Sequence, residues 1–143
     1  MVPVDREKIS VLMSELSRAR ARLERLSALP GDEFLSDEDK VASAKYNFIV
    51  AIEAAIDMTN HAIAKLGLRR PEDYADSFRA LEEAGAFDRE FADRLMEMAR
   101  FRNRLVHFYF KVDDALVRKI LEESLADLDR FSRDFRRFVG EKG

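Results

Sequence analysis

The chain has 143 residues, a formal net charge of −3 at neutral pH and no cysteine. This length suits one domain over residues 1–143, and the lack of cysteine excludes disulfides, thiolate nucleophiles and cysteine metal sites. The negative charge argues against a protein that binds nucleic acid through overall positive charge. We find no signal sequence and no apolar run of membrane length, so we expect a cytoplasmic protein without a membrane contact.

The composition predicts a helical protein. Charged residues make up 37% of the chain, whereas there are only five glycines and three prolines. Strong helix formers are abundant, and no stretch shows the alternating apolar pattern of a strand. We therefore predict an all-α fold, an antiparallel bundle of about five helices joined by short connections.

Two helices are predicted in the first half. The first should begin after Asp5 as its N-cap and run to about Leu29, where Pro30 stops it. A short loop should lead to Ser36, which opens a capping-box pattern at the start of the longest helix, and Gly67 should end that helix. About 30 helical residues span roughly 45 Å, so we expect part of this helix to project or to pack against a partner.

The longest predicted helix carries a line of polar residues beside its apolar face. Glu53, Asp57 and His61 follow one another at intervals of four residues. Two carboxylates and an imidazole are metal ligands, but no further ligand is identifiable, so we expect no metal site. We expect Glu53 or Asp57 to be the buried counter-ion of Arg102, and His61 to be a partly exposed helix histidine.

Three more helices are predicted in the second half. Asp73 should cap a short helix ending near Gly85, and Asp88 should cap the next one. After Asp113 a last helix should run to Gly140. Its inward residues should be Leu116, Ile120, Leu128, Phe131, Phe135 and Phe138.

A charged residue interrupts the apolar stripe of the fourth predicted helix. Phe91, Leu95, Met98 and Leu105 form the stripe, and Arg102 stands where an apolar residue would continue it. Burying a guanidinium without a partner costs several kcal/mol. Arg102 therefore needs a carboxylate partner or a cleft in which it meets an anion.

A histidine and a tyrosine follow this arginine. His107 lies five residues after Arg102, about 140° around a helix, so the two side chains would point apart on a continuous helix. We expect the helix to end or bend between them, because residues 108–112 are poor helix sequence. Arg102, His107 and Tyr109 are the candidate active-site residues, and Asn103, Glu53 and Asp57 are candidates for supporting roles.

Arg102, His107 and Tyr109, spaced by four residues and then one, resemble the motif of the HEPN superfamily, specifically of its HepT-like toxin branch. The resemblance covers most of residues 45–130. Its main segments are Ala51–His61, Pro71–Tyr74, Phe78, Leu81–Gly85 and Arg102–His107. It implies a homodimer with a metal-independent, cofactor-free ribonuclease site in its cleft, in which Arg102 and His107 are catalytic. It also implies a partner, an MntA-type nucleotidyltransferase antitoxin that silences the toxin by adenylylating Tyr109.

The residue chemistry agrees with this activity. RNA can be cleaved by its own 2′-hydroxyl, given a base, an acid and positive charge on the phosphorane. His107 supplies proton transfer near neutral pH, and Arg102 supplies a bidentate phosphate clamp. One histidine cannot readily be acid and base in the same step, but a two-fold dimer supplies two histidines and two arginines.

Two other interpretations stay open. One is a non-catalytic HEPN-type dimer that binds RNA, nucleotide or a protein partner through the same arginine and histidine. The other is a purely structural helical subunit.

Overall fold

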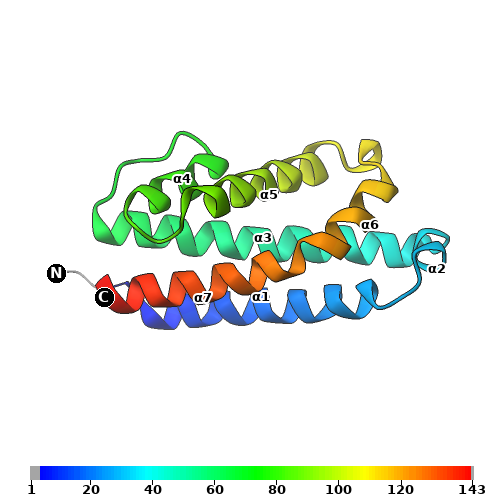
Figure 1. The fold of residues 1–143 in the computed structure, drawn as a ribbon, viewed down its shortest axis with the longest axis horizontal. Helices are drawn as coiled ribbons and strands as arrows, with labels where there is room; N and C mark the ends of the chain where they lie inside the picture. The colour runs from blue at the N-terminus through cyan, green and yellow to red at the C-terminus, as the bar shows by residue number, and fades with distance from the viewer. Residues whose placement is uncertain (1–3, 143) are drawn as a thin grey trace.

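The computed structural model describes residues 4–142, and the side chains of residues 4–140. All regular structure in this part of the chain is helical, which confirms the predicted all-α class. Figure 1 shows the arrangement of the elements. They are α1 Arg6–Ser27, α2 Gly31–Leu35, α3 Glu38–Leu66, α4 Tyr74–Glu83, α5 Arg89–His107, the short 3₁₀ helix η1 Tyr109–Lys111, α6 Asp114–Glu123 and α7 Leu125–Lys142.

Most helix ends lie where capping residues predict them. The side chains of Asp5, Asp73, Asp88 and Asp113 each accept a hydrogen bond from a backbone N–H in the first turn of α1, α4, α5 and α6. Such bonds satisfy donors that have no partner within the helix. Gly67 ends α3 with φ 66°, a left-handed conformation that glycine adopts without steric cost. These predictions are confirmed.

The connection between α1 and α3 differs from the prediction. Residues 31–35 form the short helix α2 rather than a loop, and Phe34 within it is fully buried. Burial of this ring explains why so short a segment stays helical. Asp37 rather than Ser36 caps α3, because its carboxylate accepts from the backbone N–H groups of Asp39 and Lys40.

The predicted last helix is two helices. It breaks at Ser124, and before the break Val117 and Leu121 are buried, whereas Leu116 and Ile120 are only partly buried. The inward face of α6 is therefore one residue away from the predicted one, because one helical register cannot continue across a break. After the break the predicted inward residues are buried: Leu128, Phe131, Phe135 and Phe138.

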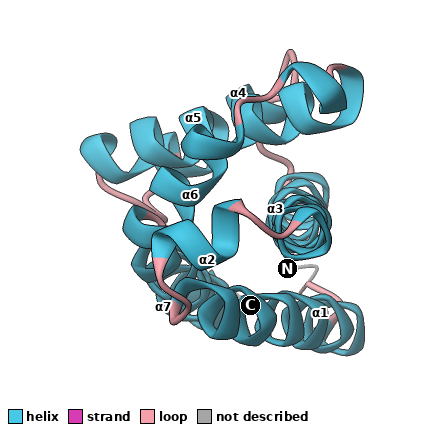
Figure 2. Ribbon diagram, turned by 90° about the vertical axis from the view of Figure 1, so that its right-hand side faces the viewer, coloured by secondary structure: helices cyan, strands magenta, loops and turns pink. Residues whose placement is uncertain are grey.

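The long helix α3 contacts every other α-helix of the fold. Consecutive long helices run antiparallel, with α1 and α7 on one side of α3 and α4 and α5 on the other (Figures 1 and 2). Buried residues extend along α3 from Val41 to Ile63, so it packs against other helices of the chain along most of its length rather than projecting. The expected contact of α3 with a partner stays a prediction.

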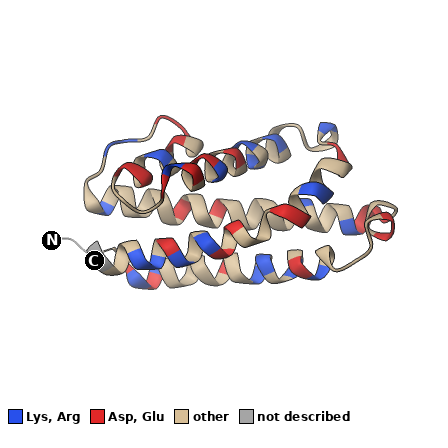
Figure 3. Cartoon of the chain, in the orientation of Figure 1, with Lys and Arg blue, Asp and Glu red and all other residues tan. Residues whose placement is uncertain are grey.

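The helices carry charges of both signs. Figure 3 shows Lys and Arg interspersed with Asp and Glu along α1, α5 and α7, in keeping with ion pairs between neighbouring helices. Across the described residues, none of the helices combines the length and the low polarity needed to span a membrane.

Candidate active site

Arg102 and His107 lie on one unbroken helix. α5 continues to His107, and the Phe108 N–H still donates to the Arg104 carbonyl at 2.8 Å. The prediction that the helix ends or bends between the two residues is therefore wrong. Leu105, 1% exposed, anchors this last turn in the core, and its burial outweighs the poor helix sequence that follows. Within one chain the two side chains point about 140° apart.

The Arg102 guanidinium is held by three neighbours. Its Nε and Nη2 donate to Glu53 Oε1 at 3.1 and 2.6 Å, and its Nη1 donates to Asn103 Oδ1 at 3.0 Å. The Tyr74 ring lies against it, with 5.2 Å from the ring centroid to Cζ. The Arg102 side chain is 14% exposed and Glu53 is its carboxylate partner, but the Glu53 side chain is 42% exposed, so the counter-ion is not buried as predicted.

This arrangement fixes the guanidinium and leaves it able to bind an anion. Its neighbours come from α3, α4 and α5 itself, so three helices set its orientation. A guanidinium has five N–H donors, and the three bonds within the described residues leave two of them for a ligand. Tyr74 could not be found by periodicity, because its contact with Arg102 depends on how α4 packs on α5.

Asp57 does not share the role of Glu53. It is exposed, one turn along α3 from Glu53, and makes no hydrogen bond to Arg102 among the described residues. Although the residue as a whole is exposed, partial desolvation of its carboxyl group and then the negative charge of Glu53 raise the pKa of Asp57. The structure thus brings Glu53 and Asn103 to Arg102 and leaves Asp57 beside them.

His61 is tied to the start of α1. Its Nε2 accepts a hydrogen bond from the Asp5 backbone N–H at 2.9 Å, so the imidazole is neutral at this nitrogen. Partial burial, then the charges of Lys8 and Lys65, lower the pKa of His61. It is the partly exposed helix histidine that the sequence predicts. No group of three His, Cys, Asp or Glu side chains in the described part of the chain could hold a metal ion.

The segment around His107 and Tyr109 is open. His107 is exposed, Phe108 is 55% exposed and Phe110 is 95% exposed. Tyr109 begins η1, is partly buried and packs edge-on against the Phe110 ring with centroids 5.2 Å apart. Apolar side chains this exposed beside a polar motif are typical of a surface that another molecule covers.

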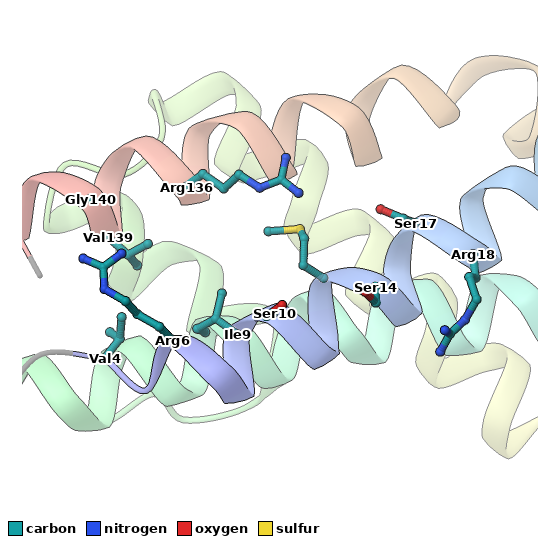
Figure 4. A pocket seen from close by; sticks show the side chains of 11 residues that line it. Val4, Arg6, Ile9, Ser10, Ser14, Ser17, Arg18, Arg136, Val139 and Gly140 are labelled. Atoms are coloured by element: carbon teal, nitrogen blue, oxygen red, sulfur yellow. The ribbon is translucent and has the colours of Figure 1, made fainter.

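The volumes of the cavities do not point to Arg102, His107 and Tyr109. A cavity of about 500 Å³ lies between α1 and α7, where Arg6, Arg18 and Arg136 line it together with serines and apolar residues (Figure 4). None of the candidate residues lines it. A polar groove of about 390 Å³ between α1 and α3 does include Glu53 and Asp57. The groove therefore reaches the carboxylate that holds Arg102.

Comparison with known proteins assigns the family. Residues 16–135, which are 120 of the 143 residues, match the family model described as "Ribonuclease HepT-like". A protein of Archaeoglobus fulgidus named "Putative RNase" is 36% identical over 109 residues, or 76% of this chain and 80% of that protein. The mRNA nuclease HepT of Shewanella oneidensis is 25% identical over 123 residues, or 85% of this chain and 92% of that protein.

Solved structures share the fold. The tri-AMPylated HEPN toxin of Shewanella oneidensis, in complex with its MNT antitoxin, superposes with a TM-score of 0.85 at 24% identity, covering 93% of this chain and 99% of that one. The cytosolic protein YutE of Bacillus subtilis superposes with a TM-score of 0.85 at 21% identity, covering 99% and 95%. The family match and the 36% identical relative establish that this chain belongs to the HepT-like ribonuclease family.

Proposed function

We propose that this chain, as one HEPN-like domain over residues 1–143, is a toxin-type ribonuclease that cleaves cytoplasmic RNA without a metal ion. Arg102 and His107 are its catalytic residues. The observation that carries the proposal is the Arg102 guanidinium, which Glu53, Asn103 and Tyr74 hold with two N–H donors left for a phosphate. The names of the relatives, an RNase and an mRNA nuclease, support the substrate class.

The proposed reaction uses the 2′-hydroxyl of the RNA as the nucleophile. A base takes the 2′-hydroxyl proton, the 2′-oxygen bonds to the adjacent phosphorus, and the bond from phosphorus to the 5′-oxygen breaks. An acid protonates the leaving 5′-oxygen, so the products are a 2′,3′-cyclic phosphate and a 5′-hydroxyl. His107 transfers protons, and Arg102 stabilises the negative charge of the phosphorane.

The proposed active form is a homodimer. Arg102 and His107 point apart on α5, so one chain does not gather both side chains and a second histidine around one phosphate. A two-fold dimer that brings the two motifs together supplies two histidines, one as base and one as acid, and two arginines. The exposed Phe108 and Phe110 beside His107 support a contact surface there.

An MntA-type nucleotidyltransferase antitoxin is the proposed regulator. The Tyr109 hydroxyl oxygen attacks the α-phosphorus of ATP, the bond from that phosphorus to pyrophosphate breaks, and a base on the transferase takes the phenol proton. The added phosphodiester competes with the RNA phosphate for the arginines of the cleft, and so inhibits without unfolding the helices. The AMPylated state and antitoxin complex of the Shewanella toxin support this regulation.

The test of the nuclease is cleavage of a labelled single-stranded RNA in the presence of EDTA. Wild type should give a cyclic phosphate, and His107→Ala should cleave about 10²-fold more slowly or worse, the scale of a lost acid–base group. His61→Ala is the matched control, because it removes the other histidine of the chain. Loss of wild-type cleavage in EDTA, or an unimpaired His107→Ala, would contradict the proposal. RNA binding without any cleavage would favour the non-catalytic alternative.

The test of the regulation is co-expression with the nucleotidyltransferase and intact-mass measurement. Wild type should gain the mass of one or more nucleotides and lose nuclease activity. Tyr109→Phe should retain most of its cleavage and stay unmodified, whereas Tyr46→Phe, a change at a tyrosine that is 63% exposed, should behave as wild type. An adduct on Tyr109→Phe, or an adduct without inhibition, would remove Tyr109 from this role.

A further inference from the structure

A buried lysine on α3 has no part in the proposed cleavage reaction. Lys45 is 6% exposed, and lysine is rarely buried unless its charge is paired. Removing an ammonium group from water without partners costs several kcal/mol. The contacts that compensate this burial therefore indicate what Lys45 does in the fold.

The Lys45 ammonium is directed at the segment that carries Tyr109. Its Nζ donates to the backbone carbonyl of Tyr109 at 3.2 Å and lies 4.4 Å from the centroid of the Tyr109 ring. It also forms an ion pair with Asp114 Oδ1 at 3.5 Å, in the first turn of α6. One side chain thus fixes the backbone and the ring of Tyr109 and connects both to two helices.

Little else holds η1 in place. This turn has three residues, none of them buried, and it has no side-chain cap. Short 3₁₀ turns have weak hydrogen-bond geometry, and a segment with few buried contacts opens readily. The ring partner of Tyr109 is Phe110, which is itself 95% exposed. A cation against an aromatic face attracts the ring electrostatically, which biases the ring orientation at such a turn.

We propose that Lys45 is a positioning residue for the modification of Tyr109. It holds the phenol in the orientation from which its oxygen attacks the α-phosphorus of a nucleoside triphosphate on the transferase. This inference rests on the proposed function, in which Tyr109 accepts the nucleotide. Lys45 contacts neither Arg102 nor His107 in the described structure, so it acts on the regulation of the site and leaves RNA cleavage to the other residues.

The experiment measures nucleotide transfer with the purified transferase and ATP, as a function of the concentration of this chain. Lys45→Met removes the charge and keeps the length of the side chain, and we expect kcat to fall about tenfold or more with KM within threefold of wild type. Lys45→Arg should restore much of the rate. Lys111→Met is the matched control, because Lys111 lies on the same turn but is exposed and faces the Phe108 ring.

Two further measurements exclude a general structural effect. RNA cleavage by unmodified Lys45→Met should stay within threefold of the wild-type rate. Its Tm, measured by thermal melting, should stay close to the wild-type Tm. A Lys45→Met chain that accepts nucleotide at the wild-type kcat overturns the inference, and so does a loss of RNA cleavage equal to the loss of transfer.

A readout without the transferase separates this inference from the proposed function. The chain has three tyrosines, so ¹³C-labelled tyrosine rings give few NMR signals. In Lys45→Met the Tyr109 ring signals should shift or broaden while those of Tyr46 and Tyr74 stay. If wild type takes no nucleotide, the modification itself is contradicted. Unchanged Tyr109 signals would overturn the positioning role of Lys45 even where transfer occurs.

Discussion

Arg102 and His107 belong to the same helix but differ in exposure and in the side chains that surround them. Arg102 is 14% exposed, and side chains from α3, α4 and α5 surround its guanidinium. His107 is exposed at the last position of α5, followed by two largely exposed phenylalanines. In the proposed site, one chain thus fixes the group that would bind the phosphate before any partner is present, whereas the surroundings of the proposed proton-transfer group depend on what covers it.

The largest expected effects are losses of RNA cleavage, which should be similar at the two residues, whereas thermal stability should distinguish them. Arg102→Ala and His107→Ala should each slow RNA cleavage about 10²-fold or more. Arg102→Ala should also lower Tm by a few degrees, because it removes about 1 kcal/mol of hydrogen bonding to Glu53 and Asn103. His107→Ala should melt as wild type. Equal melting of the two variants, measured by circular dichroism, would remove the distinction.

A smaller effect is expected at Glu53. Glu53→Ala leaves the guanidinium in place but without the carboxylate that orients it, so RNA cleavage should slow about tenfold. Glu15→Ala is the control, because Glu15 lines the same groove and is not among the hydrogen-bond or ion-pair partners of Arg102 in the described residues. Steady-state kinetics decide the matter. A Glu53→Ala chain as fast as the control would show that Arg102 needs no orientation.

The pH dependence of folding stability should show the destabilising effect of the Asp57 carboxylate at neutral pH. Its pKa is raised in the folded chain, so the folded state binds this proton more tightly than the unfolded state does. Asp57 therefore opposes folding at neutral pH, and the penalty fades as the pH falls through the folded pKa and below the unfolded value near 4. Asp57→Asn should raise stability by a few tenths of a kcal/mol at pH 7 and by nothing at pH 3. A stability gain from Asp57→Asn that grows as the pH falls would contradict the raised pKa of Asp57.

The smallest effect on stability is expected in the exposed segment that follows His107. Phe110→Ala should change the free energy of unfolding by less than about 0.5 kcal/mol, because the ring is 95% exposed. Phe101→Ala, at a ring that is 2% exposed and packs on Phe48, should cost about 3–5 kcal/mol. Denaturant titration at low protein concentration gives both values. A large loss from Phe110→Ala would mean that this segment supports the fold.

Local signals in the sequence predicted the helices that end at capping residues. Asp5, Asp73, Asp88 and Gly67 stop or start helices through bonds with their near neighbours, which the sequence alone contains. The break at Ser124 and the helix α2 depend instead on how distant segments pack, so periodicity missed them.

The site divides in the same way. Because Arg102 stands in an apolar stripe, the sequence predicted a carboxylate partner or a cleft for an anion, and Glu53 supplies the carboxylate from a position 49 residues away. Tyr74 and Lys45 were missed, because a tyrosine at a helix start and a lysine in an apolar helix carry no sign of their partners. The predicted end or bend of α5 between Arg102 and His107 is wrong, because burial of Leu105 keeps the last turn helical and packed on the core.

The unbroken course of α5 has a consequence for gene dosage. If one cleft needs His107 from both copies of the chain, a dimer with one His107→Ala copy is inactive. Activity then falls with the square of the wild-type fraction, to about a quarter when half of the copies are defective, whereas independent chains would keep about half. An inactive allele of this kind would be dominant, and a cell that expresses it in excess would be protected from its own active copy.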